Sequence, residues 1–201
     1  MGDKQGIAIA YGLIGDLLSV MGGFERSTTC IEENLRLSRE LNYKKGIAKA
    51  LNTLGDNWFY LGDYQRAIGY YNEAIEYSRE MGNRLVLGYS LIEKGQVHLM
   101  VDEISPARQL LEEGRDIALS LGNSDLTFES SILRARIFIA EGNRPEALRQ
   151  LTQLLNMVRN EREEAAVHFE IRRVADHPTK HYLRAHELYR EMYRRTPQYV
   201  Y

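Results

Sequence analysis

Residues 51–74 read LNTLGDNWFYLGDYQRAIGYYNEA and carry the clearest structural signal in the chain. Apolar side chains recur every three or four positions up to Leu61, which is the period of an amphipathic α-helix. A second run begins at Ala67 and continues through Tyr71. Gly62 lies between the two runs, where a helix commonly ends in the left-handed conformation. The stretch therefore predicts two helices joined by a tight turn.

The same pattern returns along the chain with a period of 40 residues. Gly55 belongs to a column that holds glycine or alanine five times, at Gly15, Gly55, Gly95, Ala135 and Ala175. Three further columns keep this period: Gly22, Gly62, Asp102 and Gly142; Ser27, Ala67, Ala107 and Ala147; Leu41, Met81 and Leu121. A fixed period of this length is typical of a helical-repeat array. It predicts ten helices in five antiparallel pairs.

The glycines have different expected roles at different phases of the repeat. Gly55 falls inside a helix, where glycine costs about 1 kcal/mol relative to alanine. Its recurrence indicates close approach of two helices, at which a larger side chain would overpack by about 1–3 kcal/mol. Gly62 and Gly142 should end the first helix of a pair, and Gly82 and Gly122 the second.

The second copy resembles the tetratricopeptide repeat, with Leu51, Leu54-Gly55 and Trp58 followed by Ala67, Tyr71 and Ala74. The resemblance implies an all-α fold, a right-handed α-solenoid in which 1–201 form one domain. The expected repeats are approximately 4–43, 44–83, 84–123, 124–163 and 164–197. The period exceeds the usual 34 residues of the family. In this it is similar to repeats of kinesin light chains, cell-polarity adaptors and bacterial peptide-sensing regulators.

The resemblance also implies a function, the binding of a protein or peptide in a concave groove lined by the first helix of each pair. The residues expected on the groove side are Asn52, Asp56, Phe59, Tyr89, Glu93, Gln96, Glu129, Ile132 and Arg136. Asn52 is the strongest candidate, because an amide both donates to and accepts from a peptide backbone. The alternative is that Asn52 is a solvated surface residue. The mixture of acid, amide and aromatic groups favours a ligand with apolar anchors and some basic character.

Two other functions remain open. The chain could be the peptide-sensing domain of a larger signalling or transcription regulator. It could also self-assemble, because the first helix has little polar surface: Ile7, Ile9, Leu13, Ile14, Leu17, Leu18, Val20 and Met21. The end repeats of a solenoid normally need a polar outer face. We therefore expect this helix to be covered, by further repeats or by another copy of the chain.

Composition argues against several other classes. A net charge of −2 lacks the basic excess of a nucleic-acid binder. Cys30 is the only cysteine, so neither an internal disulfide nor a cysteine-based zinc site is possible. Gly6–Phe24 is the one apolar stretch, but it aligns with the repeats and lacks the features of a signal or membrane segment. No catalytic or phosphate-binding motif is present. We expect no enzyme activity, no cofactor and no membrane or nucleic-acid partner, with a cytoplasmic location by default.

Four of the five histidines lie in one stretch: His168, His177, His181 and His186. His177 and His181 have a spacing that suits two metal ligands on one helix. Pro178 lies between them and favours a turn, so we expect no metal site. The basic and tyrosine-containing tail after Glu163 could contact an acidic partner or RNA, but it is expected to be the solvated face of a capping helix.

Overall fold

The computed structural model describes residues 3–175 and 178–195, and within these ranges the chain folds into ten α-helices without a β-strand. This confirms the predicted all-α solenoid of antiparallel helix pairs. The helices are α1 Lys4–Val20, α2 Phe24–Glu40, α3 Lys44–Tyr60, α4 Tyr64–Glu80, α5 Arg84–Met100, α6 Ile104–Leu121, α7 Ser124–Ala140, α8 Arg144–Leu155, α9 Glu161–Ile171 and α10 Thr179–Arg195.

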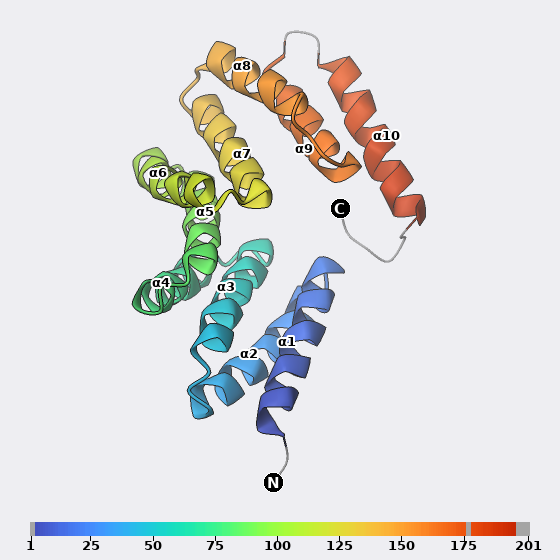
Figure 1. The fold of residues 1–201 in the computed structure, drawn as a ribbon. Coiled ribbons are helices and arrows are strands. Elements are labelled where there is room, and N and C mark those ends of the chain that lie inside the picture. The colour runs from blue at the N-terminus through green and yellow to red at the C-terminus, as the bar shows by residue number, and fades with distance from the viewer. Residues whose placement is uncertain (1–2, 176–177, 196–201) are drawn as a thin grey trace.

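Successive helices pack in pairs, and the pairs stack into an arc (Figure 1). The first helices of neighbouring pairs also touch, since α1 contacts α3, α3 contacts α5 and α5 contacts α7. Between the second helices no contact of similar extent occurs in the described part of the chain. Figure 1 accordingly shows α3 and α7 on the inner side of the arc and α4 and α6 on the outer side. We call the surface formed by α1, α3, α5, α7 and α9 the inner face.

Small residues permit close packing between helices, both within a pair and between neighbouring pairs. A Cβ atom added to Gly55 would lie 2.6 Å from the Tyr71 ring of the facing helix, closer than real contacts allow. At Gly95, the same position one repeat later, an added Cβ would lie 2.8 Å from Leu133 Cδ2. The predicted close approach at this column is therefore confirmed. The side chains that fill the space, such as Tyr71, Leu54 and Leu91, are fully buried.

The turns between paired helices also follow the sequence prediction. Gly62 has a φ of 81°, and the next amide, that of Asp63, donates to the Trp58 carbonyl over 3.0 Å. This arrangement closes the end of α3 in the left-handed conformation favoured by glycine. Asp102 fills the same column in the third repeat with a φ of 61°, a conformation that aspartate tolerates better than most residues.

The 40-residue register fails toward the C-terminus. Helix α8 is only 12 residues long and α9 only 11, whereas α1 to α7 have 17 or 18. Helix α9 begins at Glu161, three residues before the predicted start of the last repeat at 164. The cause is local, because the Asn160 side chain caps the helix by accepting from the Glu163 amide over 2.9 Å. The predicted end of this repeat, at 197, lies outside the described residues.

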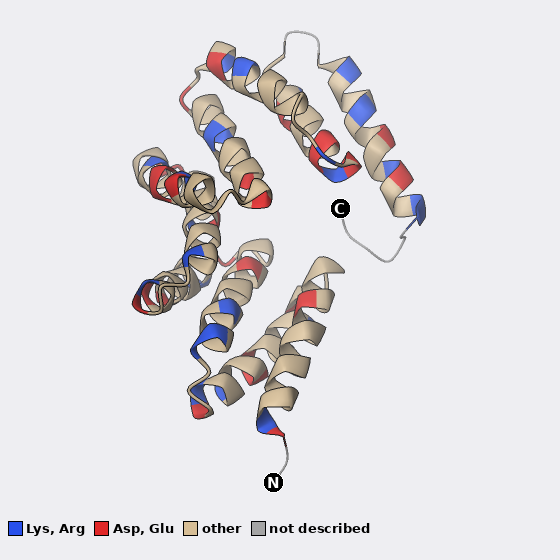
Figure 2. Ribbon diagram, viewed as in Figure 1, with Lys and Arg blue, Asp and Glu red and all other residues tan. Residues whose placement is uncertain are grey.

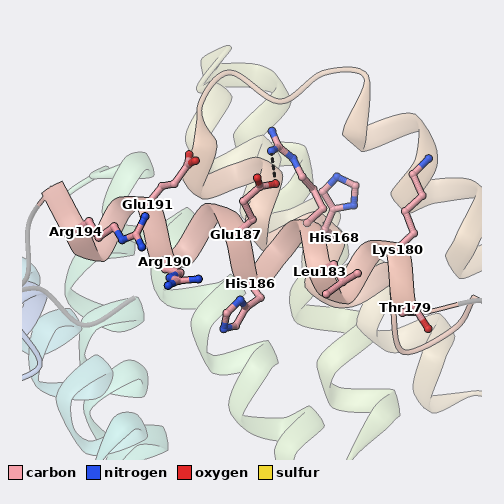
Figure 3. A pocket seen from close by; sticks show the side chains of 10 residues that line it. His168, Thr179, Lys180, Leu183, His186, Glu187, Arg190, Glu191 and Arg194 are labelled. Atoms are coloured by element: carbon pink, nitrogen blue, oxygen red, sulfur yellow. Dashed lines mark hydrogen bonds and ion pairs between the residues drawn. The ribbon is translucent and has the colours of Figure 1, made fainter.

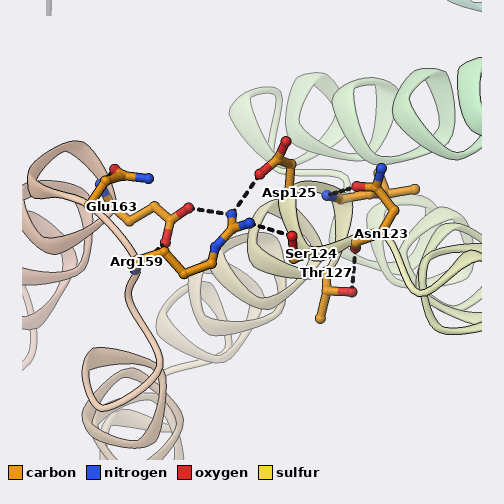
Figure 4. Close-up of polar contacts among 8 residues, drawn as sticks. Asn123, Ser124, Asp125, Thr127, Arg159 and Glu163 are labelled. Atoms are coloured by element: carbon orange, nitrogen blue, oxygen red, sulfur yellow. Dashed lines mark hydrogen bonds and ion pairs between the residues drawn. The ribbon is translucent and has the colours of Figure 1, made fainter.

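Arg159 stabilises the irregular segment between α8 and α9 (Figure 4). Its guanidinium donates to Asp125 Oδ1 over 2.6 Å and also contacts Ser124 and Glu163. The Arg159 amide donates to Glu163 Oε2 over 2.9 Å. One arginine thereby joins the loop to the start of α7 and to the first turn of α9. None of the described helices is long and apolar enough to cross a membrane.

Candidate partner-binding face

The inner face carries one carboxylate from each of its first four helices. We call Asp16 of α1, Asp56 of α3, Glu93 of α5 and Glu129 of α7 the inner-face carboxylates. Asp16 pairs with Lys49 of the next first helix. The other three are partly buried, and their negative charges influence one another. Four first helices therefore each contribute a carboxylate to this surface.

Asp56 is held by two hydrogen bonds. The Tyr71 hydroxyl donates to its Oδ1 over 2.7 Å, and Asn52 Nδ2 donates to its Oδ2 over 3.2 Å. The pKa of Asp56 is nevertheless raised to about 6. Burial of the carboxylate is the main cause, and the negative charge of Asp16 acts in the same direction. The carboxylate is therefore fixed in position but poorly compensated in charge.

Glu93 and Glu129 continue this acidic region. Burial raises the pKa of Glu93 well above its usual value, and the charges of Asp56 and Glu129 act in the same direction. Burial also raises the pKa of Glu129, against the opposing effect of Arg162 and Arg136. A carboxylate whose pKa is raised in this way is stabilised by an added cation. The inner face thus favours positive charge.

Polar side chains also link every pair of neighbouring first helices in the array. One such bond at each junction runs from Thr53 to Asp16 (3.3 Å), from Ser90 to Asn52 (2.6 Å), from Arg136 to Gln96 (2.5 Å) and from Arg136 to Glu170 (2.9 Å). They connect α1 to α3, α3 to α5, α5 to α7 and α7 to α9. Much of the polar character of the inner face therefore holds the repeats in register.

Asn52 belongs to these cross-repeat links. Its Oδ1 accepts from the Ser90 hydroxyl, and its Nδ2 donates to Asp56. Asn52 is partly buried and is not the solvated residue of the alternative interpretation. Each amide atom keeps further hydrogen-bonding capacity, since the nitrogen has two protons and the oxygen two lone pairs. A ligand would extend an existing network here.

The structure brings together most of the predicted site residues but buries two of them, Gln96 and Ile132. Tyr89, Glu93 and Glu129 lie on the inner face with Asp56. Gln96 is buried, and both ends of its amide are engaged, by Glu93 and Arg136. Ile132 is only 3% exposed and packs in the core around α8, so it cannot contact a ligand.

Phe59 lies one residue before the end of α3 and is partly buried. Its ring lies 5.3 Å from the Tyr60 ring and 5.9 Å from the Tyr64 ring, at the turn between α3 and α4. Binding by Phe59 stays a prediction. We remove the buried residues Gln96 and Ile132 from the candidate binding residues.

Two polar contacts escaped the sequence analysis. The Tyr71 hydroxyl orients Asp56, although the repeat pattern identifies Tyr71 only as a packing residue. Glu170 is 1% exposed, accepts from Arg136 over 2.9 Å and from Arg173 over 2.8 Å, and joins α9 to α7. In the sequence, the contact between Arg136 and Glu170 is visible only as two opposite charges 34 residues apart. Such pairs are too common to predict a contact.

Two of the histidines, His168 and His181, are in a contact that the sequence did not predict. His168 Nδ1 of α9 lies 2.8 Å from His181 Nδ1 of α10. His177 is outside the described residues. In the described part of the chain no three potential ligands gather to hold a metal ion. His168 and His186 also line a shallow charged surface along α10, together with Lys180, Glu187 and Arg190 (Figure 3).

Comparisons with known proteins agree with this architecture. Residues 6–80, which span the first two repeats, match the sequence profile described as Tetratricopeptide repeat. Sequence comparison with curated proteins gives no match. Among solved structures, the apo form of RapI superposes with a TM-score of 0.77 at 16% identity. That match covers 95% of this chain and 54% of RapI, so the chain spans about half the length of that relative.

Two further structures show the same fold. The tetratricopeptide-like repeats of a kinesin light chain from Podospora anserina match with a TM-score of 0.66 and 14% identity, over 96% of this chain and 99% of that one. A double mutant of MamA from RS-1 matches with a TM-score of 0.55 and 18% identity, over 96% of this chain and 98% of that one. Such repeats are generally protein–protein interaction modules. The chain therefore has a tetratricopeptide-like helical-repeat fold, and its first two repeats match the tetratricopeptide family by sequence.

Proposed function

We propose that the chain is a protein-interaction scaffold whose inner face binds a partner segment rich in basic residues. The observation that carries this proposal is the set of inner-face carboxylates, contributed by the first helices of four successive pairs. Lysine or arginine side chains of a partner would supply charge that this surface lacks. The partly buried aromatic ring of Tyr89 offers an adjacent apolar contact. The binding residues proposed are Asn52, Asp56, Phe59, Tyr89, Glu93, Glu129 and Arg136.

Such binding should depend on pH and on salt. Asp56 has a pKa of about 6, so its negative charge is lost as the pH falls through that value. A cationic ligand should therefore bind more weakly at pH 5 than at pH 7.5. Added salt should also weaken binding, because it screens charges that remain partly exposed to solvent.

The experiment compares two double variants that remove the same charge. Asp56→Asn with Glu93→Gln neutralises the inner face while keeping side-chain shape. The control, Glu112→Gln with Glu187→Gln, neutralises two exposed carboxylates on α6 and α10. The probe is a set of peptides of equal length that differ only in carrying lysine and arginine or glutamate, measured by fluorescence anisotropy and followed by affinity capture from lysate.

We expect basic peptides to bind wild type and the control, and to bind the inner-face variant at least about tenfold more weakly, which corresponds to roughly 1.4 kcal/mol. Glutamate peptides should bind none of the proteins. Equal affinity of both variants, or preference for acidic peptides, would contradict the proposal.

A regulatory role is the second candidate. The RapI chain that shares this fold is nearly twice as long as the matched region, so the fold also occurs within larger proteins. In a regulator, a bound peptide would change the superhelix and thereby act on an attached domain. Small-angle X-ray scattering with and without a basic peptide tests this, since an unchanged radius of gyration and scattering profile would argue against it.

A further inference from the structure

Helix α1 exposes more apolar surface than any other helix in the described part of the chain. Seven of its large apolar side chains are exposed to solvent: Ile7, Ile9, Tyr11, Leu13, Ile14, Leu17 and Val20. Figure 2 shows the consequence, with α1 uncharged except for its first turn and one acidic position near its end. Contiguous apolar surface of this kind marks an interaction site.

The repeat register identifies which surface this is. Ile7, Tyr11 and Ile14 are 47%, 37% and 51% exposed. The residues exactly one period later in α3 are Ile47, Leu51 and Leu54, and these are 2%, 0% and 0% exposed. Ile47, Leu51 and Leu54 pack in one cluster with Ile31 and Leu35 of α2. The exposed side of α1 is therefore the side that the second helix of a preceding repeat covers elsewhere.

The opposite end of the solenoid has a different surface. Lys180, His186, Glu187, Arg190 and Arg194 line the outer side of α10 (Figure 3). Charged residues of both signs, basic ones in excess, lie along this helix (Figure 2). Such a surface suits a terminal repeat that faces water. Stacking α10 of one molecule on α1 of another would remove these charges from water without offering them partners.

We propose that α1 is a dimerisation surface, and that its occupant is α1 of a second copy of this chain. A symmetric contact places apolar side chains of both copies against each other and brings no like charges together, since residues 5–15 carry none. Because the polar α10 end does not match α1, two copies meet by their N-terminal ends and the assembly closes as a dimer. The inner sides of α3, α5 and α7, which carry Asp56, Glu93 and Glu129, lie outside this contact, so the proposal does not rest on the partner-binding function.

The test is the mass of the protein in solution, measured by sedimentation velocity across a range of concentrations. Ile14→Glu places a charge on the proposed surface. Leu119→Glu is the matched control, because Leu119 is a similarly exposed leucine on α6. We expect wild type and the control to dimerise, and Ile14→Glu to raise the dissociation constant at least about tenfold. Circular dichroism establishes that both variants remain folded.

Cross-linking distinguishes the possible arrangements. Single cysteines replace Leu13 on α1 or Leu183 on α10 in a Cys30→Ser background, and a short bismaleimide joins nearby thiols. The proposal expects Leu13→Cys to cross-link with itself. Cross-links only between Leu13→Cys and Leu183→Cys molecules would overturn it in favour of head-to-tail stacking. A wild-type monomer at all concentrations, or a dimer unaffected by Ile14→Glu, would equally overturn it and assign α1 to a different occupant.

Discussion

The central repeats and the last repeat use the same helix pair but different contacts to hold it. In α3 to α6 the junctions are filled by buried side chains packed against glycines, as with Tyr71 against Gly55. In α9 and α10 the apolar cluster is small, and polar contacts such as His168–His181 and Arg184–Glu164 supplement it. The difference shows that loss of the 40-residue register is accompanied by replacement of close apolar packing with directional charge and hydrogen-bond contacts.

The largest expected effect comes from filling a close approach in the central region. Gly55→Val should lower the free energy of unfolding by about 3 kcal/mol or more, because the new side chain overlaps the buried Tyr71 ring. Gly69→Val is the matched control, since no atom lies within 4 Å of a Cβ at Gly69. Its effect should stay within about 0.5 kcal/mol. Urea unfolding measures both, and equal effects would show that the central packing is looser than described.

A smaller effect is expected from the buried charge at the last junction. Glu170→Ala should destabilise by about 1–3 kcal/mol, because Arg136 and Arg173 lose their shared partner while remaining partly solvated. Glu187→Ala removes an exposed carboxylate from α10 and should cost less than about 1 kcal/mol. Urea unfolding at low and high salt compares the variants. If Glu170→Ala were as mild as the control, charge would not hold α9 to α7.

The smallest effect concerns pH at the contact between α9 and α10. Burial lowers the pKa of His168, and the nearby His181 and Arg184 act in the same direction against Glu164. Burial and Lys180 lower the pKa of His181. As the pH falls, these two histidines therefore take up protons at a higher pH in the unfolded chain than in the folded one. The contact should lose stability as the pH falls below about 6.5, the ordinary pKa of histidine.

The thermal midpoint measured between pH 7.5 and 5 tests this expectation. His181→Gln should reduce the loss on acidification, whereas His186→Gln, which changes an exposed histidine, should not. Asp56 contributes with the opposite sign, since its raised pKa of about 6 makes folding more favourable as the pH falls from 6 toward 4. Comparing wild type with His181→Gln separates the contribution of the histidines from that of Asp56. Identical pH profiles for wild type and His181→Gln would contradict the assignment.

The regular part of the fold could be predicted because its rules are local and repeated. The spacing of Gly15, Gly55 and Gly95 signals close helix packing, and Gly62 and Gly142 signal turns. The irregular part could not. The early start of α9 depends on capping by Asn160 and on the Arg159 contacts, which involve distant residues such as Asp125.

The candidate site was predicted only in part, for a related reason. Repeat geometry places Asp56 and Glu93 on the inner side of the array. It does not show that Ile132, at the Asn52 phase of the repeat, turns into the core where the α7–α8 pair packs. Nor does it show that Asn52 already bonds to Ser90. Side-chain partners in a neighbouring repeat decide both outcomes, and a single repeat does not specify them.

The cross-repeat bonds have a mechanical consequence. Thr53–Asp16, Ser90–Asn52 and the two Arg136 bonds tie the inner edge of the array together, and all four are partly buried. On the outer side, the ion pairs Arg39–Glu73 and Arg79–Glu113 link α2 to α4 and α4 to α6, but these side chains are exposed to solvent. Salt screens exposed pairs more than partly buried ones, so raising the ionic strength should loosen the outer edge of the array before the inner edge.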